Sequence, residues 1–344
     1  MSKLTELFPF TSDVDMAKVL PFYNRGQREV FPRHAGTTAD QLRARNSTEM
    51  EYRFFGLDDV DGLAALGITA HFTDGSNEHL QWLQLFVRPD ARRNGHGKSL
   101  LMTAVETAEG SGRTVITSDA VNTVPASALF AASSGADEGM REHINVVAVA
   151  DVDVAMLARW RVQGPSRAPG YEVLQWDDDY ERRYDNQVAG LLVMADEDMP
   201  FEDLDLEPQT ETGTTLRERL DRQAGLYSRI TSVARHIETD TLVGFSELLR
   251  VSDSEPLLNT TLTMVHRNHR GHALGKWLKA DSILRGLARF PDTTHIQTEN
   301  AQSNAPMLGI NDAIGFVPEL ELVAYQATTA HLRDYLERNV QDEV

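Results

Sequence analysis

The stretch Val87–Leu101, VRPDARRNGHGKSLL, decides the fold class of this chain. An apolar, strand-like run, Leu80–Val87, leads into it, and after Gly97 the apolar residues recur at a helical period. Glycines between a strand and a helix N-terminus let consecutive backbone N–H groups face one anion, and the helix dipole adds partial positive charge there. The stretch therefore predicts a phosphate-binding loop in an α/β domain.

Two common phosphate loops do not fit this stretch. The Walker A loop requires glycine at position 92, which is arginine, although residues 97–99 complete its Gly-Lys-Ser end. The dinucleotide fingerprint G-x-G-x-x-G finds Gly95 and Gly97 but meets Leu100 where the third glycine belongs. The pattern present in full is R-x-x-G-x-G/A, formed by Arg92, Gly95 and Gly97.

The second half of the chain repeats the order of the first. A second loop, HRNHRGHALGKWLK, begins at His266, and Val87 and Val265 differ by 178 positions, as do Arg92 and Arg270. Further pairs keep nearly the same offset: Gly97 and Gly275, Leu100 and Leu278, Gly67 and Gly244, Gly135 and Gly315. Ordered matches at a constant offset indicate two copies of one α/β unit.

The segment Gly164–Gly170, GPSRAPG, has the composition of an interdomain linker. We therefore expect an N-terminal domain at residues 1–163, a linker at 164–170 and a C-terminal domain at 171–344.

The composition limits the classes of partner. Of 344 residues, 33 are Lys or Arg and 52 are Asp or Glu, which gives a formal net charge of −19 and argues against binding to nucleic acid or anionic lipid. The chain has no cysteine and no run of eighteen apolar residues, and its first residues do not form the apolar core of a signal peptide. We expect a cytoplasmic protein that binds neither nucleic acid nor a membrane.

With its V-x-P strand end and R-x-x-G-x-G/A, the first loop resembles the acyl-CoA loop of the GNAT superfamily of N-acyltransferases. In the second loop Ala273 replaces the first glycine, and alanine is tolerable wherever φ is negative, so we expect this copy to bind as well. The family's fourth helix runs N-x-x-A-x-x-x-Y-x-x-x-G-F. The second half matches it at Asn300, Asn304, Gly315 and Phe316 with Asn311 at the tyrosine position, and the first half has Ala131 and Ala136 at the tyrosine and phenylalanine positions.

The resemblance implies an α/β chain of two tandem GNAT domains, each a mixed, mostly antiparallel twisted sheet flanked by helices. In organisation it is similar to actinobacterial tandem proteins of the mycothiol synthase type. It implies acetyl-CoA or coenzyme A as the cofactor. The expected cofactor-binding residues are Phe86, Val87, Arg92, Arg93, Asn94, Gly95, His96, Gly97, Lys98 and Ser99 in the first domain, and Met264, Val265, Arg270, Gly271, His272, Ala273, Leu274, Gly275, Lys276, Asn300 and Asn304 in the second.

N-acetyl transfer needs a polarised carbonyl, a base for the amine and an acid for the leaving thiolate. The family's carboxylate position on the fourth strand holds Gln81 in the first half and Asn259 in the second, and neither is a base. A period of two gives the second strand a polar face and the first an apolar one, so we expect the C-terminal domain to be catalytic and the N-terminal domain to be degenerate or to bind only CoA. The two faces are Asn259, Thr261, Thr263 and Val265, and Gln81, Leu83, Leu85 and Val87.

The candidate catalytic residues are Thr263 on the polar face, Glu299 as a base and Tyr325 as an acid. Two of them have a structural alternative: Glu299 also fits a solvated strand-end carboxylate, and Tyr325 a half-buried strand aromatic. Glu247, which interrupts an apolar strand, fits either a cleft or a solvent-facing position.

Two further segments suggest ligands. His266, His269 and His272 lie three residues apart, but they occupy a loop without a nearby carboxylate, so we predict no metal site. The acidic loop Glu197–Pro208 either attracts a cationic substrate or only improves solubility.

The resulting prediction is an acetyl-CoA-dependent N-acetyltransferase, an acyltransferase in which a neutral small-molecule amine attacks the thioester directly. The backbone of Met264–Val265 would polarise the carbonyl, and loop 270–276 would hold the pyrophosphate. The alternative is a catalytically silent CoA-binding or scaffold protein of the same fold. A monomer and a homodimer are both compatible with the sequence.

Overall fold

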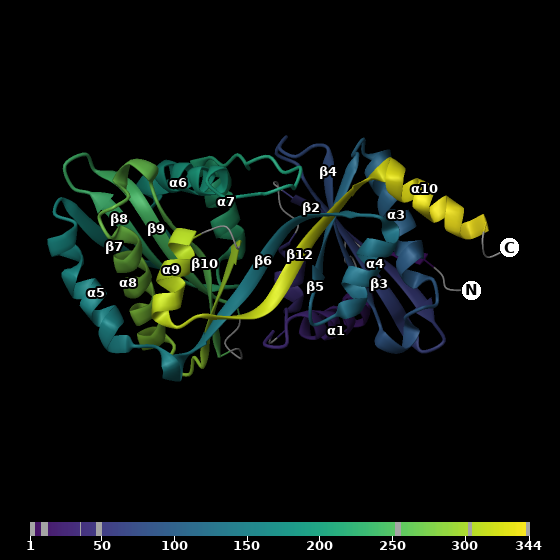
Figure 1. Cartoon of the computed structure of the whole chain (residues 1–344), viewed down its shortest axis with the longest axis horizontal. Helices are drawn as coiled ribbons and strands as arrows, with labels where there is room; N and C mark the ends of the chain where they lie inside the picture. Colours follow the sequence, from purple (N-terminus) through teal and green to yellow (C-terminus); the bar gives the residue numbers. More distant parts are fainter. Residues whose placement is uncertain are drawn as a thin grey trace. The chain divides into compact units, whose positions relative to one another are not determined.

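The computed structural model describes residues 4–7, 13–34, 36–45, 50–251, 256–301 and 305–341. The chain forms two compact units (Figure 1). Unit 1 contains Met1–Arg141, Phe201–Glu207 and Leu322–Val344, and unit 2 contains Glu142–Pro200 and Pro208–Glu321.

The sheet of unit 1 has its strands in the order β1-β2-β3-β4-β5-β12. Among the described residues of this sheet, neighbouring strands pair antiparallel except β4 and β5, which are parallel. The strands are β1 (Leu4–Glu6), β2 (Met50–Asp59), β3 (Gly62–Phe72), β4 (Leu80–Val87), β5 (Val115–Val121) and β12 (Val317–Thr328).

Helices cover both faces of this sheet because its strands alternate apolar residues on two sides. On one face Tyr23 of α1 packs with Phe54 and Ile68, and on the other Val105 of α3 packs with Leu83. The helices of unit 1 are α1 (Asp13–Val30), α2 (Ala39–Arg43), α3 (His96–Gly110), α4 (Pro125–Ser134) and α10 (Thr329–Gln341).

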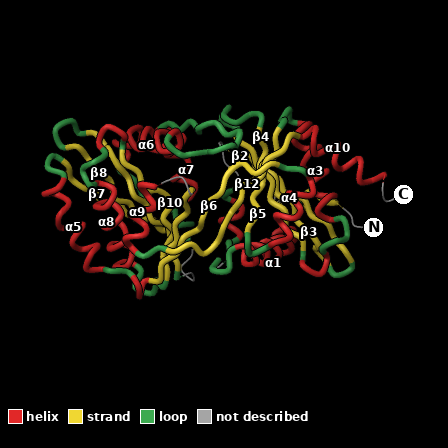
Figure 2. The backbone as a smooth tube through the Cα atoms, viewed as in Figure 1, coloured by secondary structure: helices red, strands yellow, loops and turns green. Residues whose placement is uncertain are grey.

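The sheet of unit 2 has the order β6-β11-β10-β9-β8-β7, and the pairing β10–β11 is parallel. Its strands are β6 (Asp137–Ala148), β7 (Tyr171–Asp177), β8 (Ser228–His236), β9 (Thr241–Arg250), β10 (Leu257–Val265) and β11 (His295–Ala301). Its helices are α5 (Val154–Arg167), α6 (Asp185–Glu197), α7 (Gly213–Gln223), α8 (Leu274–Arg289) and α9 (Ala305–Ile314) (Figure 2).

Unit 2 also has a helix layer on each face. Leu191 of α6 and Leu216 of α7 pack with Phe245, whereas Ile283 of α8 packs with Leu248 on the opposite face. Helices α5 and α9 contribute to the α8 side. The mixed, mostly antiparallel sheets flanked by helices confirm the predicted fold class.

The last strand of each sheet comes from the opposite half of the chain. In unit 1, residues 322–328 of β12 pair antiparallel with β5. In unit 2, residues 142–148 of β6 pair antiparallel with β11. The two halves have therefore exchanged their final strands, a feature that local sequence patterns do not encode because either pairing satisfies the same alternation.

The compact units consequently differ from the expected domain boundaries. Residues 142–163 lie in unit 2, and residues 201–207 and 322–344 lie in unit 1. The expected linker begins inside a helix, since residues 164–167 form the last turn of α5. A Cβ atom on Gly164 would lie 2.2 Å from the ring of Trp277, so this segment packs closely against α8.

Within the described residues, no helix has the length and apolar character needed to cross a membrane.

Candidate active site

The motif arginine anchors each glycine-rich loop to the protein. Arg92 Nε donates to the carbonyl of the last residue of β4 at 3.1 Å, and its guanidinium also pairs with Glu29 in the last turn of α1. Arg270 Nε donates to the carbonyl of the last residue of β10 at 3.0 Å and pairs with Asp198 at the end of α6. The arginine therefore ties the strand end and the loop to a helix in both units, α1 in unit 1 and α6 in unit 2.

Both loops use two left-handed residues at the same two positions. In unit 1 these are Arg93, with φ 66°, and Gly95, with φ 80°. In unit 2 they are Gly271, with φ 87°, and Ala273, with φ 57°. The expectation of a negative φ at Ala273 is therefore wrong: the loop keeps its shape, and the alanine bears a conformational cost of about 1 kcal/mol.

The helix that follows each loop has an open N-terminus. No side chain caps the first turn of α3 or α8, so backbone N–H groups there are available to an anion. A Cβ on Gly97 would lie 3.3 Å from Phe130, and one on Gly275 would lie 3.3 Å from Ile310. These glycines let α4 and α9 approach the helix starts, and this arrangement suits the pyrophosphate of an acyl-CoA.

The parallel strands beside each loop separate before they reach it. The pairing of β4 with β5 ends at Trp82 and Thr117, and that of β10 with β11 ends at Thr260 and Thr298. Beyond these residues the facing strand edges no longer pair with each other. Each unit therefore has an unpaired stretch between its two central strands, next to its glycine-rich loop, which we call the opening.

Strand β10 contains a bulge that β4 lacks. β4 has 8 residues and β10 has 9, and the register with β9 shifts at Thr261. A bulge turns the residues on its two sides toward opposite faces of the sheet. Thr261 Oγ1 donates to Glu247 at 2.9 Å, while Thr263 contacts the neighbouring Ser246 at 2.9 Å on the α8 side.

The common face predicted for residues 259, 261, 263 and 265 is therefore wrong. Thr263 is buried within a hydroxyl network that continues from Ser246 to Ser282 of α8, at 3.1 Å. This position makes Thr263 a packing residue between sheet and helix. In unit 1, where no bulge occurs, Leu83 and Leu85 pack against α3 as expected, and the amide of Gln81 donates to Ala104 of that helix at 2.9 Å.

Glu247 is the centre of a buried polar cluster on the α6–α7 side. It accepts hydrogen bonds from Tyr180 at 2.5 Å and from Thr261 at 2.9 Å, and it forms an ion pair with Arg229 at 3.3 Å. Thr231 donates to the same carboxylate at 3.3 Å. Burial raises the pKa of Tyr180 well above its usual range, so this hydroxyl remains a donor. Glu247 is thus a buried, fully engaged carboxylate rather than a solvent-facing one.

A chain of polar side chains connects α8, α9 and β11 in unit 2. The ammonium of Lys279 donates to Asn311 at 2.5 Å, and the amide of Asn311 donates to Asn300 at 2.5 Å. The corresponding residues of unit 1, at offsets of 178 and 180, are Leu101, Ala131 and Ala120.

Tyr325 lies in unit 1, not beside the second loop. As part of β12 it pairs with Ser118 of β5, its ring packs near Ala131 of α4, and its hydroxyl donates to Glu138 at 3.1 Å. The prediction that Tyr325 is an acid at the second site is wrong because the strand exchange carries it into the other unit.

Each opening carries a carboxylate at the same place. Glu299 of β11 is exposed and lies one residue past the last β10–β11 pair. Because the next residue, Asn300, points toward α9, Glu299 points to the α6–α7 side. Its counterpart in unit 1 at an offset of 180 is Asp119, which solvent reaches but which protein atoms crowd, and this desolvation raises the pKa of its carboxyl to about 6.

The remaining predicted cofactor residues lie at or near the loops, except Asn304, which is outside the described residues. The side chains of Phe86 and Met264 are engaged in the core, Phe86 against Tyr23 and Met264 in the α6–α7 layer. The ammonium of Lys276 lies 5.1 Å from the ring centroid of Trp160. His96 and Leu274 are buried; Asn94 donates to Ala91, and Ser99 to Gly95. Val87, Val265, Lys98 and His272 flank the loops.

The loop histidines of unit 2 surround an aromatic ring. Tyr171 contacts His269 through a hydrogen bond of 2.9 Å, and the rings of His236 and His272 lie 5.1 and 5.5 Å from its own. Burial, followed by the neighbouring histidines, lowers the pKa of His269. Among the described residues, no group of three or more metal-binding side chains is placed to hold an ion.

The middle of the acidic loop belongs to unit 1. The buried side chain of Asn77 clamps the backbone of Glu207, accepting from its N–H and donating to its carbonyl, both at 2.8 Å. Gln326 similarly binds the backbone of Asp203 and Asp205. The loop is therefore fixed, at the β4 and β5 ends opposite the glycine-rich loop of unit 1.

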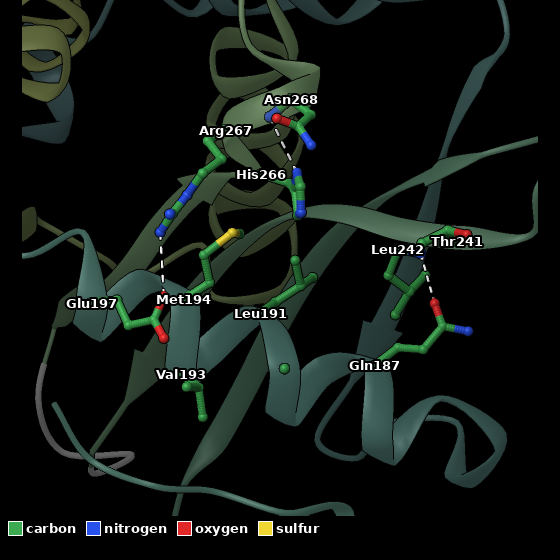
Figure 3. Close-up of a pocket in the computed structure, with 11 residues that line it drawn as sticks. Gln187, Leu191, Val193, Met194, Glu197, Thr241, Leu242, His266, Arg267 and Asn268 are labelled. Atoms are coloured by element: carbon green, nitrogen blue, oxygen red, sulfur yellow. Dashed lines mark hydrogen bonds and ion pairs between the residues drawn. The ribbon is translucent and has the colours of Figure 1, made fainter.

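One pocket of about 510 Å³ lies in unit 2 between α6, the start of β9 and the residues after β10 (Figure 3). Its floor is apolar, with Leu191, Met194 and Leu242, and Glu197 pairs with Arg267 at its rim. No described residue of β11, α8 or α9 lines it. The pocket is thus on the α6 side and separate from the opening between β10 and β11.

The comparisons with known proteins agree with this geometry. Residues 18–135 match the model of the acetyltransferase (GNAT) family. A tandem GNAT protein from the clavulanic acid biosynthesis pathway, solved without acetyl-CoA, has a TM-score of 0.78 and 23% identity, covering 96% of this chain and 99% of that one. A GCN5-related N-acetyltransferase from Sphaerobacter thermophilus has a TM-score of 0.63 and 10% identity, covering 95% and 96%. Curated protein sequences gave no match.

Residues 18–135, which include the first loop, thus match the GNAT family, and the whole chain shares the fold of a tandem GNAT protein. These similarities support the predicted acyltransferase of the N-acetyltransferase class. The further likeness to mycothiol synthase-type proteins stays a prediction.

Sequence reasoning missed two residues of this region. Asp119 was overlooked, although its offset of 180 from Glu299 was available as a signal. Lys279 was overlooked because one lysine in an amphipathic helix carries no signal of burial.

Proposed function

We propose that the protein is an acetyl-CoA-dependent N-acetyltransferase that modifies a small-molecule amine, and that unit 2 is the catalytic unit. One comparison carries the proposal. Asn300, which lies beside the opening between β10 and β11, is the half-buried end of a buried polar chain that continues to Asn311 and Lys279, where unit 1 has two alanines and a leucine. A reaction that moves protons requires such groups, whereas a silent copy does not.

In this proposal loop 270–276 holds the pyrophosphate through backbone N–H groups at the start of α8. The β10 edge beyond Thr260 supplies backbone donors to the thioester carbonyl. Bound acetyl-CoA supplies the activated acyl group.

The acceptor amine enters from the α6–α7 side, which Glu299 faces. The amine must be neutral to attack, and Glu299 takes its proton, directly or through one water. The nitrogen then bonds to the acyl carbon, the C–S bond breaks, and the nitrogen loses its second proton to solvent. The thiolate takes a proton from solvent, because Tyr325 lies in unit 1. The carboxylate also favours a cationic acceptor, and use of acetyl-CoA implies a cytoplasmic location.

The second candidate, a silent CoA-binding or scaffold protein, is favoured by one observation. Asn311 occupies the position of the family's tyrosine acid, and it cannot donate a proton to a thiolate.

The two candidates separate in one experiment. Thiol release from acetyl-CoA is measured with a panel of polyamines, aminoglycosides, amino acids and amino sugars, while CoA binding is measured by calorimetry. Amine-dependent thiol release supports the enzyme. CoA binding without release for any amine would favour the scaffold.

A further inference from the structure

Lys279 is a lysine in an unusual environment. It lies in the middle of α8 with 0% of its surface exposed, and the ring of Phe316 lies 5.2 Å from its ammonium. Among the described residues, its hydrogen-bond partner is the neutral Asn311. Burial lowers the pKa of Lys279 to about 7. A buried cation without a carboxylate partner opposes folding, so stability does not explain the presence of this residue.

The chemistry of Lys279 fixes the direction of the whole polar chain. In its protonated form Lys279 only donates, so the oxygen of Asn311 faces it, as in the hydrogen bond of 2.5 Å from Nζ to Oδ1. The NH₂ group of Asn311 then faces Asn300, whose oxygen accepts it at 2.5 Å. The NH₂ group of Asn300 consequently points away from Asn311. This orientation follows from the donor-only end of the chain, although amide oxygen and nitrogen atoms have similar shapes.

Asn300 is placed to use that donor. It lies on β11, two residues beyond the last pair with β10, and it is half-buried, so solvent reaches it. It also lies on the α8–α9 side, the side of the open helix N-terminus at loop 270–276. A directed N–H donor at this position faces the space that the proposed function assigns to acyl-CoA.

We propose that Lys279 is a positioning residue: through Asn311 it holds the amide of Asn300 as a hydrogen-bond donor to acyl-CoA in the opening between β10 and β11. This inference rests on the proposed function of unit 2. Unit 1 has no equivalent, since Leu101, Ala131 and Ala120 form no hydrogen-bonded side-chain chain.

The variant Asn311→Asp tests the direction of the chain. The introduced carboxylate would accept from Lys279 and could only accept from Asn300, so the Asn300 amide must turn its NH₂ group inward and its oxygen toward the opening. The variant would not weaken the fold, because the buried lysine gains a carboxylate partner. We expect CoA affinity, measured by calorimetry, to fall about tenfold while the melting temperature stays level or rises. Unchanged affinity with higher stability would mean a purely structural role and overturn the proposal.

The measurements are made in full-length Gly97→Glu protein, so that CoA binding at the first loop does not mask binding at the second.

Lys279→Met provides a second test, since methionine has similar length but no donor. We expect several-fold weaker CoA binding. Leu101→Met, at the equivalent position of unit 1, is the matched control. If the Gly97→Glu protein binds CoA and neither the Asn311 nor the Lys279 variant changes the affinity, only the positioning role fails. If it binds no CoA, the proposed function of unit 2 fails together with this inference.

Discussion

The openings of the two units have the same backbone frame and different linings. In both, an arginine anchors the loop, two left-handed residues shape it, and an uncapped helix follows. At the positions where unit 2 has the chain from Lys279 to Asn300, unit 1 has Leu101, Ala131 and Ala120, and β4 lacks the bulge that β10 has at Thr261. The difference teaches that a cofactor loop and the chemistry beside it can diverge independently after a duplication.

The most direct test of this difference between the two units is to block each glycine-rich loop in turn. A glutamate at Gly275 would crowd Ile310 and repel a pyrophosphate, and the same change at Gly97 would crowd Phe130. We expect Gly275→Glu to reduce kcat/KM by about a hundredfold or more and Gly97→Glu to have little effect on it. Steady-state kinetics with both proteins checks this. Loss of activity in the Gly97 variant alone would show that unit 1 is the catalytic unit.

The paired carboxylates offer a second comparison. Glu299→Gln removes the proposed base and is expected to lower kcat about a hundredfold at neutral pH, whereas Asp119→Asn is expected to leave it unchanged. If Glu299 is the base, the loss diminishes at high pH, where the free amine is more abundant. A pH–rate profile of both variants measures this. An effect confined to Asp119→Asn would contradict the assignment of unit 2.

Lys279 also distinguishes unit 2 from unit 1 through the pH dependence of the free energy of unfolding. Its pKa is about 7 in the folded protein and about 10.4 when unfolded, so between these values the unfolded chain binds more protons. The contribution of this group therefore makes the protein more stable as pH rises from about 7 toward 10, by about 1.4 kcal/mol per pH unit. Urea unfolding curves at several pH values measure the free energy of unfolding. We expect its increase with pH to be absent in Lys279→Met and retained in Leu101→Met. A slope that persists in Lys279→Met would show that another group, not this lysine, is the source of the pH dependence.

The smallest expected effect concerns loop strain. Ala273→Gly relieves a left-handed alanine and is expected to stabilise unit 2 by about 0.5–1 kcal/mol, whereas Gly95→Ala introduces the same strain and costs a similar amount. Thermal unfolding of the two variants measures the effect. Equal shifts of the same sign would show that the loops do not share one backbone shape.

The loops were predictable because their function depends on adjacent residues: the arginine, the glycines and the following helix are all local. The side of the sheet on which each residue of β10 lies was not predictable. A one-residue bulge at Thr261 moves every later side chain to the opposite side, and no sequence pattern marks the bulge. The place of Tyr325 was not predictable either, since two copies of the same strand pattern fit either sheet equally well. The polar chain became visible only when burial was known, although Asn300 and Asn311 had been singled out by position.

The exchange of β6 and β12 makes the sheet of each unit depend on both halves of the chain. If either half of the chain were deleted, the sheet that remained would present an open edge at β5 or β11, a site for aggregation or for swapping between molecules. Only the last strand of the remaining half, β6 against β5 or β12 against β11, could close that edge within one molecule. The first half of the chain is therefore also a folding partner of the second, because its β6 completes the sheet that contains β10 and β11.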